Sequence, residues 1–163
     1  MRVATAQDLL EISEVLYRYS DAMDRRDWAL MDEVFTEDAT ADIAGHLFPS
    51  GRDSIVVTIR AAIECCSATH HMNTNVQAQI DGDRAHVTHR FLAWHRGRGA
   101  CADTTYLTLG TYADEFVRTA NAWRIRHRQE RNPVEIWSDM NAPGDQQAFF
   151  AAALTAFARV ARP

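Results

Sequence analysis

Three polar side chains from two distant segments of the sequence are of the types that proton-transfer chemistry needs. His71 lies in the segment THHMNTN, and Tyr19 and Asp24 lie in the segment YRYSDAMDRRDW. An unperturbed histidine titrates at about pH 6.5, and a carboxylate bound to one ring nitrogen fixes the tautomer and stabilises the imidazolium. His71 is therefore a candidate general base, and Asp24 is the candidate residue that orients it.

The strand expected over residues 70–80 determines where His71 points. Alternation places His71 on the same face as Asn73, Asn75 and Gln77. A row of polar side chains on one face indicates either exposure to solvent or a polar lining of a cavity. Two interpretations therefore stay open, a base in a cavity and a surface or hydrogen-bonded strand histidine.

A helix expected over residues 6–25 would carry the other two groups. Thr5 and Asp8 resemble a capping box, and apolar residues recur at helical spacing after them. Tyr19 belongs to the apolar stripe and could simply pack in the core, whereas Asp24 lies about 120° from the centre of the stripe. An acid near a helix C-terminus is unfavourable unless a cation meets it, and a protonated imidazole would be such a cation.

The remaining elements indicate an α+β fold. Further helices are expected at 27–35 and 53–66, strands at 39–44, 70–80, 84–95, 103–117 and 122–131, and an apolar helix at 145–161. Helices followed by a run of antiparallel strands predict helices packed on the concave face of a strongly curved, mostly antiparallel sheet. A bent sheet covered in this way would enclose a pocket for a small ligand.

Composition limits the classes of function. The 163 residues, 47% of them hydrophobic, predict one globular domain over residues 1–163, with a core from about residue 5 to 140. A formal net charge of −5 with scattered arginines argues against nucleic acid as a partner. No apolar run approaches the roughly 18 residues of a membrane span, and the N-terminus lacks the apolar core of a signal peptide. We expect a cytoplasmic protein without a membrane partner.

Cofactor and metal motifs were also sought. The three cysteines, Cys65, Cys66 and Cys101, form neither a metal-ligand pattern nor an even-numbered disulfide framework, and we expect reduced thiols. The sequence contains no HExxH, paired CxxC, GxSxG, P-loop or GxGxxG motif. We expect neither a cofactor nor a metal ion.

The order of these segments, with AMDRRDW, HHMNTN and WRIRHR in their places, resembles the SnoaL-like branch of the nuclear transport factor 2-like superfamily from residue 5 to about 140. Within that branch the sequence most resembles members with an Asp and His pair, namely the bile acid 7α-dehydratase, hexachlorocyclohexane dehydrochlorinase and scytalone dehydratase families. The resemblance implies a cone-like α+β barrel and a cofactor-independent lyase acting on a small hydrophobic cyclic molecule. It assigns the base to His71 and the orienting role to Asp24.

The resemblance also implies two assisting residues. Tyr19 stands where the bile acid dehydratases have a catalytic tyrosine, and Arg128 matches a pocket arginine of the same relatives. Arg124 and Arg126 share the strand alternation of Arg128, so a solvated basic edge is the other interpretation. His95 lies at the spacing of a second histidine of scytalone dehydratase, but no local motif supports that match and it is not included in the predicted site.

Other activities and partners stay open. The same residues could serve a ketosteroid-type isomerase, and polyketide cyclisation would need a later acid that the sequence does not match. A non-catalytic binding or assembly subunit, such as the small subunit of a ring-hydroxylating dioxygenase, is the alternative from another class. The apolar helix at 145–161 and the resemblance lead us to expect a homo-oligomer, a trimer before a dimer.

Overall fold

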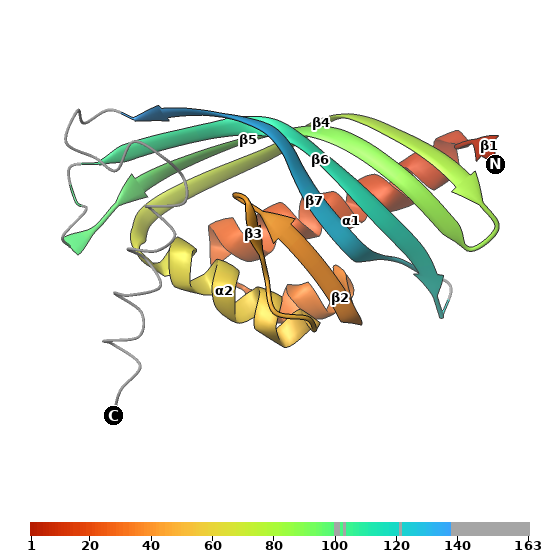
Figure 1. The fold of residues 1–163 in the computed structure, drawn as a ribbon, viewed down its shortest axis with the longest axis horizontal. Coiled ribbons are helices and arrows are strands. Elements are labelled where there is room, and N and C mark those ends of the chain that lie inside the picture. Colours follow the sequence, from red (N-terminus) through yellow and green to blue (C-terminus); the bar gives the residue numbers. More distant parts are fainter. Residues whose placement is uncertain (100–101, 103, 121, 138–163) are drawn as a thin grey trace.

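A computed structural model describes residues 1–99, 102, 104–120 and 122–137. Figure 1 shows two helices on one side of a sheet, beneath its four long strands. The elements in chain order are β1 Arg2–Val3, α1 Ala6–Arg25, the 3-10 helix η1 Trp28–Glu33, β2 Phe35–Ile43, β3 His46–Leu47, α2 Arg52–Glu64, β4 Cys66–Asp81, β5 Arg84–Gly97, β6 Thr105–Thr119 and β7 Ala122–Trp137.

The strands form one mixed sheet. Its order is β1-β4-β5-β6-β7-β2-β3, and every neighbouring pair is antiparallel except β2 and β7, which are parallel. The hydrophobic core lies between the helices and the inner face of this sheet. The predicted α+β class and the mostly antiparallel sheet are thus confirmed, whereas the strongly curved, cone-like shape stays a prediction.

Helix α1 begins where its sequence predicts. Thr5 and Asp8 form a complete capping box, in which each side chain bonds the backbone N–H of the other. Arg2 also donates to the Asp8 carboxylate at 2.7 Å, and these hydrogen bonds hold the pKa of that carboxyl well below its usual range. The helix ends at Arg26, whose backbone adopts the left-handed conformation with φ 58°.

Three elements differ from the expectation. The second helix is a short 3-10 helix that ends at Glu33, and Phe35 already belongs to β2 because that strand pairs with β7 from its first residue. The two-residue strands β1 and β3 were not predicted, since so few residues carry no periodicity. The helix predicted at 145–161 lies outside the described residues.

A bulge in β4 corrects the predicted faces of that strand. The pairing with β5 shifts between Thr74 and Gln77, and Asn75 has φ 54°. After the bulge the inward positions are those of Val76 and Ala78, so Asn75 and Gln77 are exposed. The prediction that they share the face of His71 was wrong, because an extra residue reverses the alternation beyond it.

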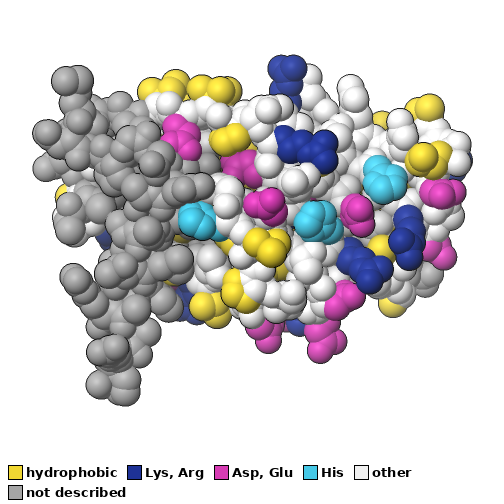
Figure 2. Space-filling view, in the orientation of Figure 1, with side chains coloured by type: hydrophobic (Ala, Val, Ile, Leu, Met, Phe, Trp, Pro, Cys, Tyr) yellow, Lys and Arg dark blue, Asp and Glu magenta, His cyan; other side chains and the backbone are white. Residues whose placement is uncertain are grey.

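Surface charge and hydropathy add two observations. On the face drawn in Figure 2, basic side chains alternate with acidic ones and form no continuous basic patch. None of the helices within the described ranges is long and apolar enough to cross a membrane.

Candidate active site

Asp24 and His71 meet between the end of α1 and the inner face of β4. The Nδ1 atom of His71 lies 2.6 Å from Oδ1 of Asp24, and the backbone N–H of His71 donates to Oδ2 at 2.9 Å. The Thr69 hydroxyl donates to Oδ1 at 2.9 Å. Farther along the strand, Asn73 donates to the Leu16 carbonyl at 3.1 Å, which fastens β4 to the helix.

The direction of these hydrogen bonds fixes the tautomer of His71. Arg26 donates to the Thr69 hydroxyl at 2.8 Å, so the single proton of that hydroxyl is left for Asp24. An ionised carboxylate accepts only, and therefore Nδ1 of His71 carries a proton and donates it. In the neutral ring Nε2 then holds a lone pair, as a general base requires.

The surroundings of Asp24 favour its charged form. Burial opposes ionisation, but the hydrogen bond and charge of His71, with further bonds from the His71 backbone and Thr69, outweigh burial and lower the pKa of Asp24. The side chains of Asp24 and His71 are 19% and 12% exposed, so water reaches the pair only partly. A charged Asp24 can stabilise the imidazolium that forms when His71 accepts a proton.

A cavity of about 50 Å3, which opens to solvent, lies beside this pair between the helices and the sheet. Its apolar lining comes from both helices and from the sheet, and its polar lining consists of histidines, tyrosines and a threonine. The lining residues are Tyr19, Met23, Ile43, Ile59, Ala62, Ile63, His71, Phe91, Ala93, His95, Tyr106, Thr108 and Tyr112.

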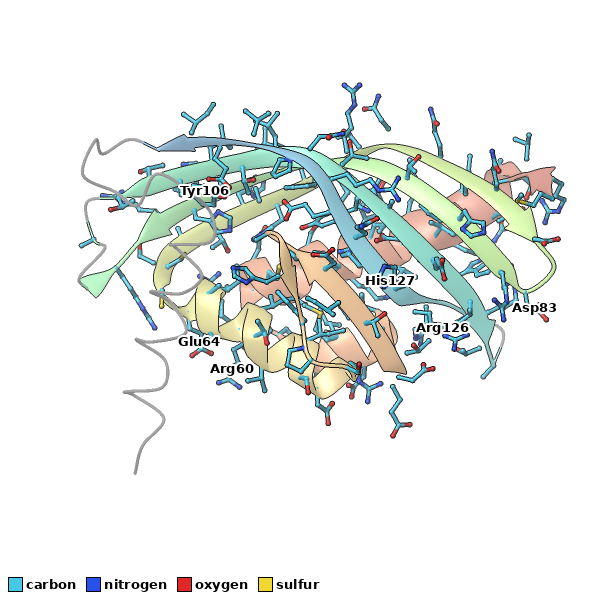
Figure 3. The ribbon with its side chains drawn as sticks, in the orientation of Figure 1. Arg60, Glu64, Asp83, Tyr106, Arg126 and His127 are labelled. Carbon is cyan, nitrogen blue, oxygen red and sulfur yellow. The ribbon has the colours of Figure 1, made fainter. Side chains whose placement is uncertain are left out.

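Large aromatic side chains of the core divide into two groups. Phe91 and Tyr106 line the cavity. Figure 3 shows Tyr106 near the end of the sheet where β6 begins. Trp28, Phe35 and Phe48 pack elsewhere in the core.

His95 lies beside His71, although it was left out of the predicted site. The two rings are perpendicular, with centroids 5.1 Å apart, and His95 stacks on Tyr106 at 5.5 Å. Burial, aided by the charge of His71, lowers the pKa of His95 to about 3. His95 is therefore neutral near pH 7. The regular inward alternation of Phe91, Ala93 and His95 along β5 was the sequence signal that could have found it.

Arg128 is fully buried, and it lies behind the cavity instead of lining it. It binds Asp114 through two hydrogen bonds, Nε to Oδ1 at 3.0 Å and Nη2 to Oδ2 at 2.7 Å. His89 Nε2 lies 3.2 Å from the same carboxylate. The Arg128 guanidinium is held between the rings of Tyr19 and Tyr112, 4.2 and 4.3 Å from their centroids. Arg128 thus lies behind two cavity tyrosines, and its predicted role in the site stays a prediction.

A second bulge explains why the basic-edge interpretation of Arg128 is wrong. On β6, Glu115 pairs with His127 and the next residue pairs with Ile125, so Arg126 is an extra residue in β7. Figure 3 shows Arg126 and His127 on the stretch of β7 that runs beside β2. Arg126 is exposed, and beyond it the alternation reverses, which turns Arg128 into the core.

Burial and the neighbouring ion pair of Arg128 and Asp114 together determine the pKa values of the cavity tyrosines Tyr19 and Tyr112. Burial opposes the charge of Asp114, but Arg128 and His89 hold its pKa below the usual range. Burial raises the pKa of Tyr19, and the charge of Arg128 offsets part of that rise. Burial likewise raises the pKa of Tyr112. Both phenols therefore keep their protons and can act as hydrogen-bond donors.

The described residues contain no group of three His, Cys, Asp or Glu side chains placed to hold a metal ion. The thiols of Cys65 and Cys66 donate to the carbonyl oxygens of Ala61 and Ala62, and Cys101 falls in a gap of the described residues. What the cavity does bring together is a histidine with a bare Nε2, a neutral second histidine and protonated phenols. This set can accept a proton from carbon and donate hydrogen bonds to oxygen.

The chain is similar in sequence and in fold to several known proteins. An uncharacterized protein of Mycobacterium tuberculosis, Rv2910c, is 33% identical over 132 residues, which cover 80% of this chain and 88% of that protein. The crystal structure of Kfla4162 from Kribbella flavida is similar, with a TM-score of 0.71 and 29% identity over 78% of this chain and 93% of that one.

Two structures of lower identity share the fold. A candidate scytalone dehydratase from Novosphingobium aromaticivorans gives a TM-score of 0.70 at 23% identity, covering 85% of this chain and 91% of that chain. The hexachlorocyclohexane dehydrochlorinase LinA type 2 gives 0.68 at 15%, covering 83% and 93%. The model of the SnoaL-like domain matches residues 4–129. With most of its length matched, the chain belongs to the SnoaL-like family.

Proposed function

We propose that the protein is a cofactor-independent lyase that catalyses a β-elimination on a small hydrophobic cyclic molecule. His71 accepts a proton from carbon through Nε2, and the electrons of that C–H bond form the new double bond while halide or hydroxide leaves with its own bonding pair. A departing hydroxide takes the proton from the His71 imidazolium and becomes water, which restores the neutral base. Asp24 stabilises the imidazolium. The observation that carries the proposal is the 2.6 Å contact between His71 and Asp24 in the wall of a mainly apolar cavity.

Tyr19 is the proposed hydrogen-bond donor to an oxygen of the substrate, either a carbonyl or a departing hydroxyl. Its phenol lines the cavity and stays protonated. Arg128 contributes through the ring of Tyr19 and does not contact the substrate in this proposal. A positioned base supplies roughly 10²- to 10⁴-fold, so preorganised donors and orientation must supply the remaining acceleration.

Related folds support this class of reaction. The names of two structural neighbours refer to dehydration of scytalone and dehydrochlorination of hexachlorocyclohexane. Both are eliminations. Because the identities to this chain are only 23% and 15%, these names support the reaction class and leave the substrate to experiment.

Isomerisation by the same groups is the second candidate. Moving a proton between two carbons needs a base and a donor to the carbonyl oxygen, and the protonated Tyr19 favours this activity too. A cyclase would need a further acid. A non-catalytic subunit would not need the Asp24–His71 contact, so a dyad at hydrogen-bond distance beside a cavity argues for the enzyme.

The assembly and location proposed with this function are a homo-oligomer, a trimer before a dimer, in the cytoplasm. Light scattering of the purified chain measures the assembly directly. A monomer at micromolar concentration would contradict it.

Ligand screening by thermal shift tests the proposed substrate class. Steroids, polyketide-like aromatics and halogenated alicyclic compounds are the panel, and a compound at 100 times its Kd should stabilise the fold by about 2.7 kcal/mol. Binders are then assayed for elimination by mass spectrometry. We expect a loss of 18 or of about 36 mass units, for water or HCl.

Substitution of the base decides the mechanism on any substrate found. His71→Ala should lower kcat by about 10²- to 10⁴-fold, since proton transfer by a positioned base supplies that much. His86→Ala is the matched control, because His86 is exposed on the outer face of β5. Full activity in His71→Ala would refute the proposed base.

A further inference from the structure

Arg26 is a hydrogen-bond hub next to the dyad, with no role in the mechanism above. Its guanidinium reaches the region where the C-terminal ends of α1 and α2 meet the start of β4. The acceptors are the carbonyl oxygens of Met23, Asp24, Ile63 and Cys66 at 3.0, 3.1, 3.3 and 3.2 Å and the Thr69 hydroxyl at 2.8 Å.

Three of these bonds, to the carbonyl oxygens of Met23, Asp24 and Ile63, are those of a structural cap, and the fourth reaches the Cys66 carbonyl at the start of β4. Carbonyl oxygens at the end of a helix lack intrahelical partners, and an arginine that binds them stabilises the helix ends. The fifth bond differs, because the Thr69 hydroxyl is also bonded to the catalytic pair. Capping alone does not require that bond.

The donors and acceptors of Arg26 and Thr69 fix the direction of each hydrogen bond between Arg26, Thr69 and Asp24. A guanidinium has donors only, whereas a hydroxyl has one proton and can accept as well. Thr69 therefore accepts from Arg26 and donates to Oδ1 of Asp24, the same oxygen that receives the proton of His71 Nδ1. The other oxygen receives the backbone N–H of His71.

We propose that Arg26 and Thr69 are positioning residues that hold the Asp24 carboxylate in the orientation and charge state in which it binds His71 Nδ1. The catalytic consequence of this role depends on the proposed function, because it matters only if His71 is the base. Without the Thr69 hydroxyl, Oδ1 would keep only the imidazole as its donor, and the carboxylate could rotate about its Cβ–Cγ bond.

Charges around Asp24 must be considered in any titration of this network. On α1 and its cap the nearest is Arg26, and on β4 they are His71 and His70, whose Nδ1 lies 3.8 Å from Oδ2 of Asp24. On β5 the neutral His95 lies beside His71. A variant at Thr69 changes none of these charges, so it isolates the hydrogen bond.

Thr69→Val is the decisive variant, with Thr69→Ser as its control. Valine keeps the shape but removes the hydroxyl, whereas serine keeps the hydroxyl. In a 13C NMR titration of the carboxyl groups, Thr69→Val should raise the acid pKa of Asp24 by about one unit, a tenfold change, since a hydrogen bond to a charged group contributes that much. Thr69→Ser should leave it within a few tenths of the wild-type value.

Nitrogen-15 shifts of the His71 ring provide a second readout. At alkaline pH the wild type should show the tautomer with the proton on Nδ1, and Thr69→Val should show a mixture of both tautomers. The melting temperature should change little, because Arg26 keeps its four carbonyl partners. With an identified substrate, kcat should fall about tenfold and KM should stay nearly unchanged.

Arg26→Lys tests the first link of the network. A lysine keeps the charge but lacks the planar fork that reaches three elements at once. We expect a pKa change of Asp24 in the same direction as in Thr69→Val, and smaller. An Asp24 pKa equal to the wild-type value would remove Arg26 from the proposal.

Two outcomes would overturn the proposal as a whole. Unchanged Asp24 and His71 signals in Thr69→Val would show that the hydroxyl does not position the carboxylate. Equal changes in Thr69→Ser and Thr69→Val would show that the effect does not follow the hydroxyl, because serine retains it. Neither readout needs a substrate, so these failures are separate from retained turnover in His71→Ala, which would refute the base alone.

Discussion

Replacing His95 by phenylalanine should remove a large part of the loss of stability that this protein suffers in acid. Phenylalanine keeps an aromatic ring on Tyr106 but cannot take up a proton. His95 is 8% exposed, and its pKa in the folded protein is about 3, compared with about 6.5 for an unperturbed histidine.

The direction in which stability changes with pH follows from proton uptake by His95. As pH falls below 6.5 the unfolded chain binds a proton at this histidine and the folded protein does not, so acid favours unfolding until the pH reaches the folded pKa near 3. The stability is fully present above pH 6.5. Between pH 7.5 and 4.5 this single group costs about 2.7 kcal/mol, from RT ln[(1 + 10²)/(1 + 10⁻¹·⁵)].

Urea denaturation at pH 7.5 and pH 4.5 measures the effect in both proteins. Over this interval the free energy of unfolding of the wild type should fall by about 2.7 kcal/mol more than that of His95→Phe. This figure is an upper value, because the charges of Asp24, His71 and Arg26 also act on His95. His86→Phe, at an exposed position, should lose as much as the wild type. Equal losses in the wild type and His95→Phe would refute the inference that burial keeps His95 neutral.

Three further substitutions test the cavity and its support. Tyr19→Phe should lower kcat on an identified substrate by about 10²-fold with little change in KM, since it removes one donor to the developing charge. Asp114→Ala should destabilise the fold by about 3–5 kcal/mol in urea denaturation, because it leaves the charge of Arg128 buried without its partner. Gly110→Ala should cost about 1–3 kcal/mol, measured in the same way, because a Cβ there would lie 2.9 Å from the ring of Phe91, which lines the cavity.

Controls for these variants come from the same chain. Tyr17→Phe alters an exposed tyrosine of α1 and should leave kcat unchanged. Asp38→Ala breaks an exposed ion pair with Arg126, 3.6 Å apart, and should cost at most about 1 kcal/mol. A loss of stability for Asp114→Ala as small as that for Asp38→Ala would contradict the buried ion pair. A neutral Gly110→Ala would show that the Phe91 ring has room to move.

Local patterns in the sequence predicted the elements that carry the site. The capping box at Thr5 and the apolar stripe of α1 depend on residues a few positions apart, and the structure has both. Strands β4 to β7 were predicted because alternation persists over many residues. The proximity of Asp24 and His71 was proposed from their chemistry, and the two side chains do meet. Their catalytic roles stay predictions.

Local sequence patterns could not predict the features that depend on pairing between strands. The face of Arg128 follows from the extra residue at Arg126, and only the register with β6 reveals that residue. His95 faces His71 because Thr69 and His95 are paired across β4 and β5. No sequence pattern singles out Asp114, since a single acid on a strand gives no signal until its partner is known.

The bulge at Asn75 lets one continuous strand serve two environments with incompatible patterns. Before it, β4 presents His71 and Asn73 inward, and after it the same strand presents Val76 and Ala78 to the core. A regular strand of this composition would have to turn either the histidine or the aliphatic residues toward solvent. The extra residue therefore uncouples the half of β4 that carries His71 from the half that packs in the core, so that side chains around His71 can change while the core contacts of β4 stay as they are.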